Sequence, residues 1–167
     1  MHYQAPRTAN LLGAASLAVT DAVRDAVEKV TGFGGALPAA LVTIDAYPGR
    51  SMEALRIALG ISQPGVVRLV ERLETEGWAR RGPAKGRAVA LELTPSGRRT
   101  VAKLLSARDD ALVALLEPLS PPERRQLTPL LAKLLAAQTH DRGSLEQLCR
   151  LCQRPACHHC PVAGALR

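Results

Sequence analysis

The apolar positions between Ser62 and Gly77 recur every three or four residues, which is the spacing of an α-helix with one buried face. Ser62 is suited to cap this helix, Pro64 is tolerated in its first turn, and Gly77 can end it. The pattern predicts a helix of about 14 residues, an ordinary length. Its apolar face carries Val66, Leu69, Val70 and Leu73, and its other face carries Gln63, Val67, Arg68, Glu71, Arg72 and Thr75.

A shorter helix is predicted immediately upstream, in SMEALRIALGIS (residues 51–62), with an end at Gly60. The two helices are then joined by a three-residue turn that contains glycine, which is the spacing of a helix-turn-helix. The residues expected to point inward from the shorter helix are Leu55, Ala58 and Leu59.

A basic hairpin is predicted to follow Gly77. Residues 78–81 and 88–93 form two short strands, and the turn GPAKGR between them carries Lys85 and Arg87. In the second strand the inward residues alternate with outward ones: Val89, Leu91 and Leu93 against Ala90 and Glu92.

Longer amphipathic helices are predicted on both sides of this unit. One covers Thr8 to Val30 and is broken by TGFGGA, and a second starts at Leu37 and stops before Pro48. After the hairpin, Thr94 opens a long helix, and the sequence 120–123 is a capping box at the start of a last one. Pro129 is expected either to bend this last helix or to mark a later start. The apolar face of the last helix carries a stripe of leucines: Leu127, Leu130, Leu131, Leu134 and Leu135.

The predicted fold class is therefore mostly α-helical with a small β wing. We expect a winged helix-turn-helix DNA-binding region at 37–99, dimerisation helices at 1–36 and 100–140, and a cysteine-rich tail at 141–167. The outer helices exceed what one small winged helix needs to cover its core, which favours a subunit interface. The alternative, that they complete the core of a monomer, stays open.

Charge changes the picture in favour of nucleic acid. Residues 50–99 hold ten Lys or Arg against five Asp or Glu, whereas the residues before them and residues 100–141 carry almost no net charge. Such clustering is what binding to phosphates requires, although a solvated basic surface is the alternative. With only four aromatic residues, the chain offers few platforms for stacking unpaired bases, so duplex DNA is favoured.

Other function classes find little support in the sequence. No apolar run reaches the length of a membrane span, and the start of the chain lacks a secretion signal, so a cytoplasmic protein is expected. All four histidines lie outside the expected helical core, and no nucleophile with its base or phosphate-binding glycine loop is present, so we expect no enzyme. The alternatives kept open are a thiol-disulfide redox protein that uses Cys149 and Cys152, and a winged-helix module that binds proteins.

The tail contains every cysteine of the chain, in CRLCQRPACHHC. Two C-x-x-C pairs in a reducing compartment favour a metal site, because each pair offers two thiolates from one turn. Zinc is the first candidate, an iron–sulfur cluster the second, and a thiol redox switch the alternative. We expect the tail to lie against the dimerisation helices and to couple metal or redox state to DNA affinity. The predicted ligands are Cys149, Cys152, Cys157 and Cys160.

The order of all these elements, from residue 8 to about residue 138, resembles the MarR family of bacterial transcriptional regulators. The resemblance implies a homodimer, with the first and last helices at the dimer contact, that regulates a promoter by occupying it. Repression is the family's more frequent mode. It also implies that Arg87 enters the minor groove from the wing. Lys85 stands where the family usually has an aspartate, which puts the wing's conformation in doubt. In members of this family small ligands often bind between the dimer helices and the winged region, but this sequence indicates no particular ligand.

The predicted DNA contacts combine this resemblance with the charge pattern. Arg68 is the candidate for a bidentate contact to guanine, with a phosphate contact or an ion pair to Glu71 or Glu74 as alternatives. The full set is Ser62, Gln63, Pro64, Gly65, Val67, Arg68, Arg72, Arg81, Lys85 and Arg87.

Overall fold

The structure is a computed structural model, and it describes residues 4–85, 88–154, 157 and 159–166. The elements follow one another in the predicted order, with two short helices added in the tail. They are α1 (Gln4–Thr31), α2 (Leu37–Ala46), α3 (Met52–Leu59), α4 (Gln63–Thr75), β1 (Ala79–Lys85), β2 (Ala88–Leu93), α5 (Pro95–Leu116), α6 (Pro121–Ala137), α7 (Arg142–Leu148) and α8 (Pro161–Gly164).

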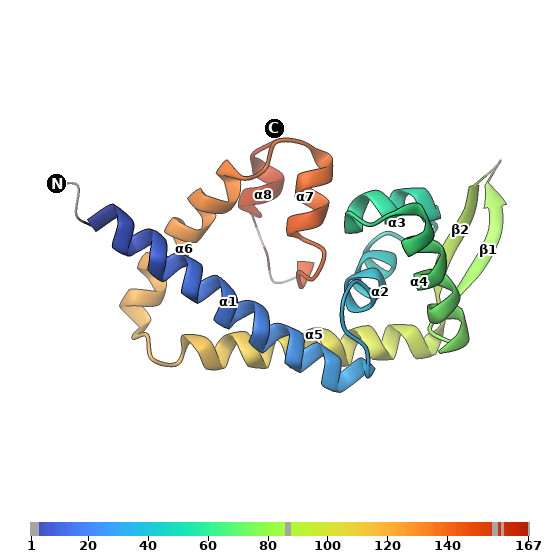
Figure 1. Ribbon diagram of the computed structural model, residues 1–167, viewed down its shortest axis with the longest axis horizontal. Helices are drawn as coiled ribbons and strands as arrows, with labels where there is room; N and C mark the ends of the chain where they lie inside the picture. Colours follow the sequence, from blue (N-terminus) through green and yellow to red (C-terminus); the bar gives the residue numbers. More distant parts are fainter. Residues whose placement is uncertain (1–3, 86–87, 155–156, 158, 167) are drawn as a thin grey trace.

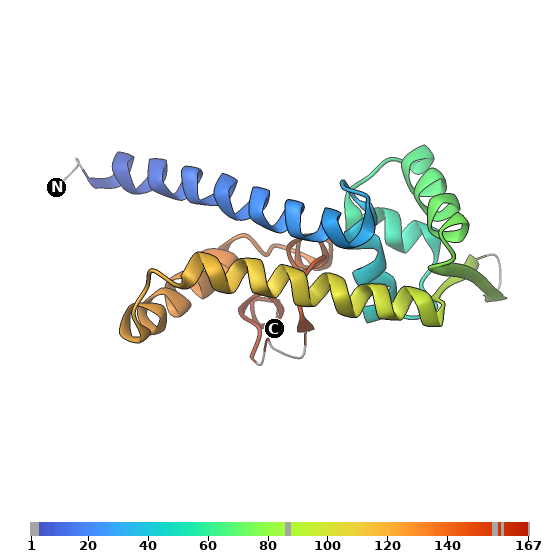
Figure 2. The same cartoon turned by 90° about the horizontal axis from the view of Figure 1, so that it is seen from below.

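The molecule is elongated, with the two longest helices as its spine. Helices α1 and α5 pack side by side, and Figure 2 shows them running together along most of the length. Figure 1 shows α2, α3, α4 and the hairpin gathered at one end and α6 at the other, with α7 and α8 between them. The spine therefore separates a small helical and β unit from a mainly helical arm.

The core lies in the small unit and is built from aliphatic side chains. Helix α2 is buried from Leu37 to Ile44, so it lies at the centre of this unit. The predicted apolar face of α4 is confirmed, because Val66, Val70 and Leu73 are fully buried and Leu69 is partly so. The largest fully buried side chains that join them are Leu41, Leu55, Leu91 and Leu104.

Local capping chemistry fixes the helix-turn-helix as predicted. The Ser62 hydroxyl accepts a hydrogen bond from the Gly65 N–H at 3.3 Å at the start of α4. Gly60 ends α3 with φ 65°, and Gly77 follows α4 with φ 68°, so both occupy the left-handed region that glycine tolerates. The turn between the helices consists of residues 60–62, as the sequence indicated.

The wing departs from the prediction in two ways. Strand β1 does not end at residue 81 but continues to Lys85, with a register shift between Arg81 and Ala84. Pro83 lies within the shift, where a residue without an N–H interrupts the ladder at least cost. The expectation that Ala90 points outward is wrong: it is 6% exposed, because Ser51 pairs with it as an additional bridge across β2.

The outer helices form as predicted, with small differences. Helix α1 begins at Gln4, before the expected residue 8, and its buried apolar residue is Val27. Helix α6 runs continuously through Pro129 with its capping box formed, and none of its residues is buried. Among the described helices, none combines the length and the apolar character needed to cross a membrane.

The tail contains structure that the sequence did not predict. Helix α8 packs on α6, and helix α7 packs on α3. Figure 1 shows this arrangement, with the tail in orange and red beside α3. The expectation that the tail lies against the dimerisation helices therefore describes only one of its two contacts. The other contact is with the helix-turn-helix.

Candidate nucleic-acid interface

The first turn of α4 is part of the exposed surface of the helix-turn-helix. Ser62, Gln63 and Pro64 are exposed, while Gly65 and Val67 are half-buried. Because the opposite face of α4 is fixed in the core by Val66 and its neighbours, these residues are presented on a rigid support. At this helix start Pro64 has no N–H and the Gly65 N–H is bonded to the Ser62 hydroxyl, so among the described residues the Gln63 N–H is the one left for a phosphate.

Arg68 continues this surface one turn along the helix. Its side chain is exposed, and in the part of the chain that the structure describes it forms no ion pair. The alternative in which Glu74 neutralises Arg68 is not observed, because Glu74 instead binds Arg81, with 3.3 Å between carboxylate and guanidinium. The Arg68 guanidinium is therefore available to a partner.

The other two predicted arginines are already engaged within the chain. Arg72 forms an ion pair with Glu76 at 3.0 Å, and its guanidinium lies 4.4 Å from the centre of the Phe33 ring. Arg81 is bound to Glu74. Each side chain is about half exposed, so contact with DNA requires each arginine to exchange or share its partner. Arg87 lies outside the described residues.

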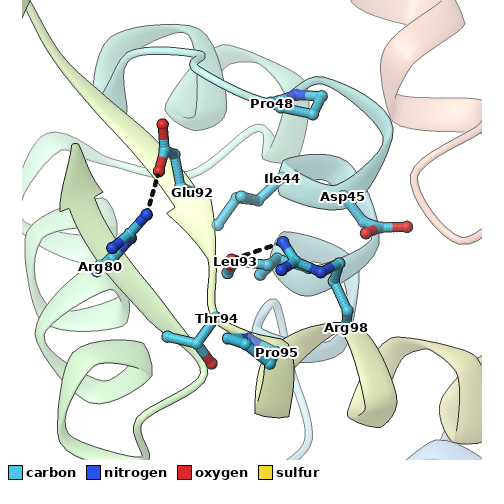
Figure 3. Close-up of a pocket in the computed structure, with 9 residues that line it drawn as sticks. All are labelled: Ile44, Asp45, Pro48, Arg80, Glu92, Leu93, Thr94, Pro95 and Arg98. Atoms are coloured by element: carbon cyan, nitrogen blue, oxygen red, sulfur yellow. Dashed lines mark hydrogen bonds and ion pairs between the residues drawn. The ribbon is translucent and has the colours of Figure 1, made fainter. Parts of the chain in front are cut away.

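The root of the wing is fixed by charged groups around a shallow pocket of about 380 Å³. Figure 3 shows Arg80 bound to Glu92 across the two strands, at 3.0 Å, and Arg98 reaching from α5 to the Leu93 carbonyl, at 2.9 Å. The first contact joins the two strands to each other, and the second joins the hairpin to the start of α5. Sequence reasoning did not single out Arg98, whose only signal was its place among the basic residues.

A second charged cluster joins the tail to the helix-turn-helix. Both terminal nitrogens of Arg50, just before α3, donate to the Glu146 carboxylate of α7, at 2.8 and 2.6 Å. Hydrogen bonding from Arg50 and from Arg142 lowers the pKa of Glu146, against the opposing effect of burial. Tyr47 lies between two guanidinium groups, 3.7 Å from that of Arg50 and 4.2 Å from that of Arg154. This cluster was missed by sequence reasoning because its members are far apart in the chain.

The four predicted thiol ligands occur as two turns at helix ends. Cys149 follows α7, and the Cys152 N–H donates to the Cys149 carbonyl at 3.1 Å. Cys160 caps α8, with its sulfur 3.5 Å from the Ala163 N–H. All four cysteines are free thiols. Among the described residues, no group of three or more His, Cys, Asp or Glu side chains is arranged to hold a metal ion.

A larger pocket of about 490 Å³ lies where α1, α2 and α5 meet the tail. Its wall is mostly aliphatic, with Leu148 and Leu151 contributed by the tail and arginines 24, 108 and 150 at its edge. The tail therefore closes one side of this space.

Comparisons with known proteins agree with this geometry. No family model matches the chain. It is 30% identical over 117 residues to the transcriptional repressor MprA of Escherichia coli K12, an alignment that covers 68% of this chain and 66% of the length of MprA. A solved structure of the transcriptional repressor CouR bound to a 23-mer DNA duplex is 31% identical, with a TM-score of 0.59, and the match covers 74% of this chain and 89% of CouR. The MarR family protein Rv2887 of Mycobacterium tuberculosis, solved in complex with DNA, is 21% identical, with a TM-score of 0.65. The match covers 75% of this chain and 95% of Rv2887.

The predicted fold class, a mostly helical winged helix with a two-stranded wing, is confirmed by these likenesses.

Proposed function

This chain belongs to the MarR family of transcriptional regulators, and on that premise we propose that it is a homodimeric repressor that binds a specific sequence in double-stranded DNA. The observation that carries the proposal is the exposed, capped start of α4, with Arg68 beside it in no ion pair among the described residues. Membership of a family of transcription regulators also confirms the prediction that the chain is not an enzyme. Two relatives that are repressors by name, one of them bound to a DNA duplex, support repression through DNA binding.

The proposed contacts divide into positioning and base reading. Ser62 and Gln63, including the Gln63 backbone N–H, bind phosphate and base edges, and Arg68 reads guanine in the major groove. Lys85 and Arg87 follow the backbone and the minor groove from the wing. This division assigns sequence preference to α4 and most of the salt-dependent affinity to the basic wing.

The proposed dimer is supported by apolar side chains that the single chain leaves uncovered. Helix α6 has no buried residue although its sequence is rich in leucine, and α1 and α5 also expose aliphatic residues near the same end. Patches of this kind mark sites of association. A two-fold dimer would place two α4 helices about 34 Å apart, which matches successive major grooves. The uncovered side chains include Leu11, Leu12, Leu17, Val113, Leu115, Leu130, Leu131 and Leu134.

We also propose that the tail modulates DNA binding through its thiols, by metal or by redox state. What supports this is the contact of α7 with α3, because it joins the cysteine segment to the helix-turn-helix directly.

The test of base reading is an Arg68→Ala variant on a duplex selected from a random-sequence library by the native dimer. Loss of a bidentate contact should weaken binding by about 1–3 kcal/mol on the selected duplex, and the loss should vanish when one particular base pair is changed. Affinities are measured by fluorescence anisotropy at fixed salt, with Arg125→Ala on the exposed arm as the control. Equal weakening on every duplex would show that Arg68 contacts phosphate and does not read a base. Failure of the native chain to select any duplex would refute the DNA-binding proposal and favour the protein-interaction module.

A further inference from the structure

The two cysteine pairs are brought together by the packing of the tail helices. The first pair follows the end of α7 and the second opens α8, and these two helices contact each other. The first pair lies in a tight turn, in which the Cys152 N–H donates to the Cys149 carbonyl, and just before the second pair the Cys157 N–H donates to the Arg154 carbonyl at 3.0 Å. Within the second pair, His159 has a φ of 54°, which a side-chain-bearing residue rarely adopts and which tightens the turn.

The thiols influence one another electrostatically, as neighbours must. Burial raises the pKa of Cys149 to about 12, with further contributions from Cys152 and Cys160. The pKa of Cys157 is raised by burial and by Cys160. Cys160 differs: burial acts against it, but the N–H groups of Ala163 and Val162, with two neighbouring thiols, lower its pKa. Hydrogen bonds join the Cys149 thiol to those of Cys152 and Cys160, and the Cys157 thiol to that of Cys160, so the four sulfurs form one group.

We propose that these four cysteines bind one thiophilic divalent cation, for which zinc is the probe, and that the bound ion holds α7 against α3. As the side chains are placed, no three ligands are arranged around a common point, so the ion must draw the sulfurs inward. Each thiol releases its proton to solvent as its sulfur binds, and no electron is transferred. The resulting site would carry two negative charges.

The contact between α7 and the DNA-binding unit gives this ion its effect. The Arg50 and Glu146 side chains are only 18% and 8% exposed, so their ion pair is shielded from water. The backbone of Arg50 is also hydrogen-bonded to the wing, because the Leu91 N–H of β2 donates to the Arg50 carbonyl at 2.9 Å. Beyond this pair, the Gln147 side chain packs on Gly60 in the turn between α3 and α4. A fixed α7 therefore fixes the start of α3, the turn and the root of the wing together.

The expected consequence is a metal-dependent affinity for DNA. A tail that is ordered by the ion leaves less conformational freedom to be lost when α4 and the wing bind DNA. We expect zinc-loaded protein to bind its selected duplex about tenfold more tightly than chelated protein. This last step rests on the proposed function, whereas binding of zinc and ordering of α3 do not.

The experiment uses the full chain, purified without air, and zinc alone as the added ligand. Native protein should bind one zinc per chain, and Co²⁺ in its place should give the strong near-ultraviolet band of thiolate coordination. The Cys160→Ser variant should show a weaker band, and the four-Cys→Ser variant should lose it. No zinc bound beyond the four-Cys→Ser level, or a disulfide in the native tail without metal, would overturn the metal site.

The coupling is measured separately, by hydrogen exchange of the α3 amides with and without zinc. Exchange should slow on zinc loading in the native chain and in Glu117→Gln, a control on the exposed arm, but not in Glu146→Gln, which keeps all four thiols. Unchanged exchange in the native chain, or an equal response in Glu146→Gln, would overturn the coupling. If zinc binds and α3 is ordered but no duplex is bound, the DNA-binding proposal fails while this one stands.

Discussion

Gly97 shows how closely the wing and α5 approach each other. The Thr94 hydroxyl donates to the Gly77 carbonyl at 2.6 Å and accepts from the Gly97 N–H at 3.0 Å, which pulls the first turn of α5 against the hairpin. A Cβ atom on Gly97 would overlap the carbonyl of Trp78. The absence of a side chain at this position is therefore a packing requirement.

We expect Gly97→Ala to destabilise the protein by about 1–3 kcal/mol, because the backbone of Trp78 must move to admit the new methyl group. Gly13→Ala is the matched control: it also lies in a helix, but a Cβ there meets no atom within 4 Å. Denaturant unfolding at one fixed chain concentration measures both variants. An equal effect of the two substitutions would show that the approach to Trp78 is not limiting.

The pair of Arg50 and Glu146 predicts a pH dependence. Hydrogen bonding from Arg50 lowers the pKa of Glu146, so the folded tail favours the ionised carboxylate. Its contribution to stability is complete at neutral pH and declines as pH falls below the ordinary carboxyl pKa of 4.5 and through the lowered value. Hydrogen exchange of α7 between neutral pH and about pH 3 should show this loss in the native chain. In Glu146→Gln the same pH range should have little effect on α7, and a similar decline there would assign the effect to other groups.

At the scale of elements, α6 illustrates a helix whose sequence and surroundings disagree. Its leucines have the spacing of a buried face, yet Leu130, Leu131 and Leu134 are 60%, 44% and 49% exposed. Helix propensity and the capping box of Ser120 and Glu123 account for the helix itself, since both lie within a few residues. Within the part of the chain that the structure describes nothing covers these leucines, and the second copy of the chain proposed above would cover them.

We therefore expect Leu134→Lys to shift the protein to monomers. Burying an unpaired ammonium in the proposed interface costs several kcal/mol, so the dimer dissociation constant should rise roughly 100-fold or more. Analytical ultracentrifugation measures it, with Gln126→Lys as a control that adds the same charge outside the leucine stripe. Dimers of unchanged stability in Leu134→Lys would place the subunit contact elsewhere.

The features that sequence predicted well are those set by neighbours in the chain. Ser62, Gly60 and Gly77 define helix ends through contacts within about four residues, and the buried face of α4 follows from a local period. The burial of Ala90 was missed because it depends on a bridge to Ser51, and the Arg50–Glu146 pair because 96 residues separate its members. The added strand length of β1 was missed because glycine and proline usually end a strand, whereas here the ladder resumes after them.

At the scale of the whole molecule, charge distribution decides how binding responds to salt. The net charge of +7 is concentrated in the winged region and the tail, while the arm is nearly neutral. Affinity for DNA should therefore fall steeply with ionic strength, because binding of the winged end to DNA releases cations that were bound to the DNA phosphates.

Lys85→Ala should weaken binding to all duplexes alike and reduce the slope of log affinity against log salt by about 2 per dimer, one for each lysine removed. Lys133→Ala, which removes the same charge from the exposed arm, should leave the slope nearly unchanged. Titrations at several salt concentrations give both slopes. Equal reductions in the two variants would show that net charge, and not a contact at the wing, determines the dependence.

The contact between α7 and α3 also has a practical consequence for work on this protein. A chain shortened to the part that resembles its relatives, ending near Gln138, would retain α1 to α6 and keep the helix-turn-helix complete. It would nevertheless remove the Glu146 carboxylate that Arg50 binds just before α3, together with the helix that helps to shield this pair from water. Measurements on such a fragment would report on a helix-turn-helix that lacks the contact with α7.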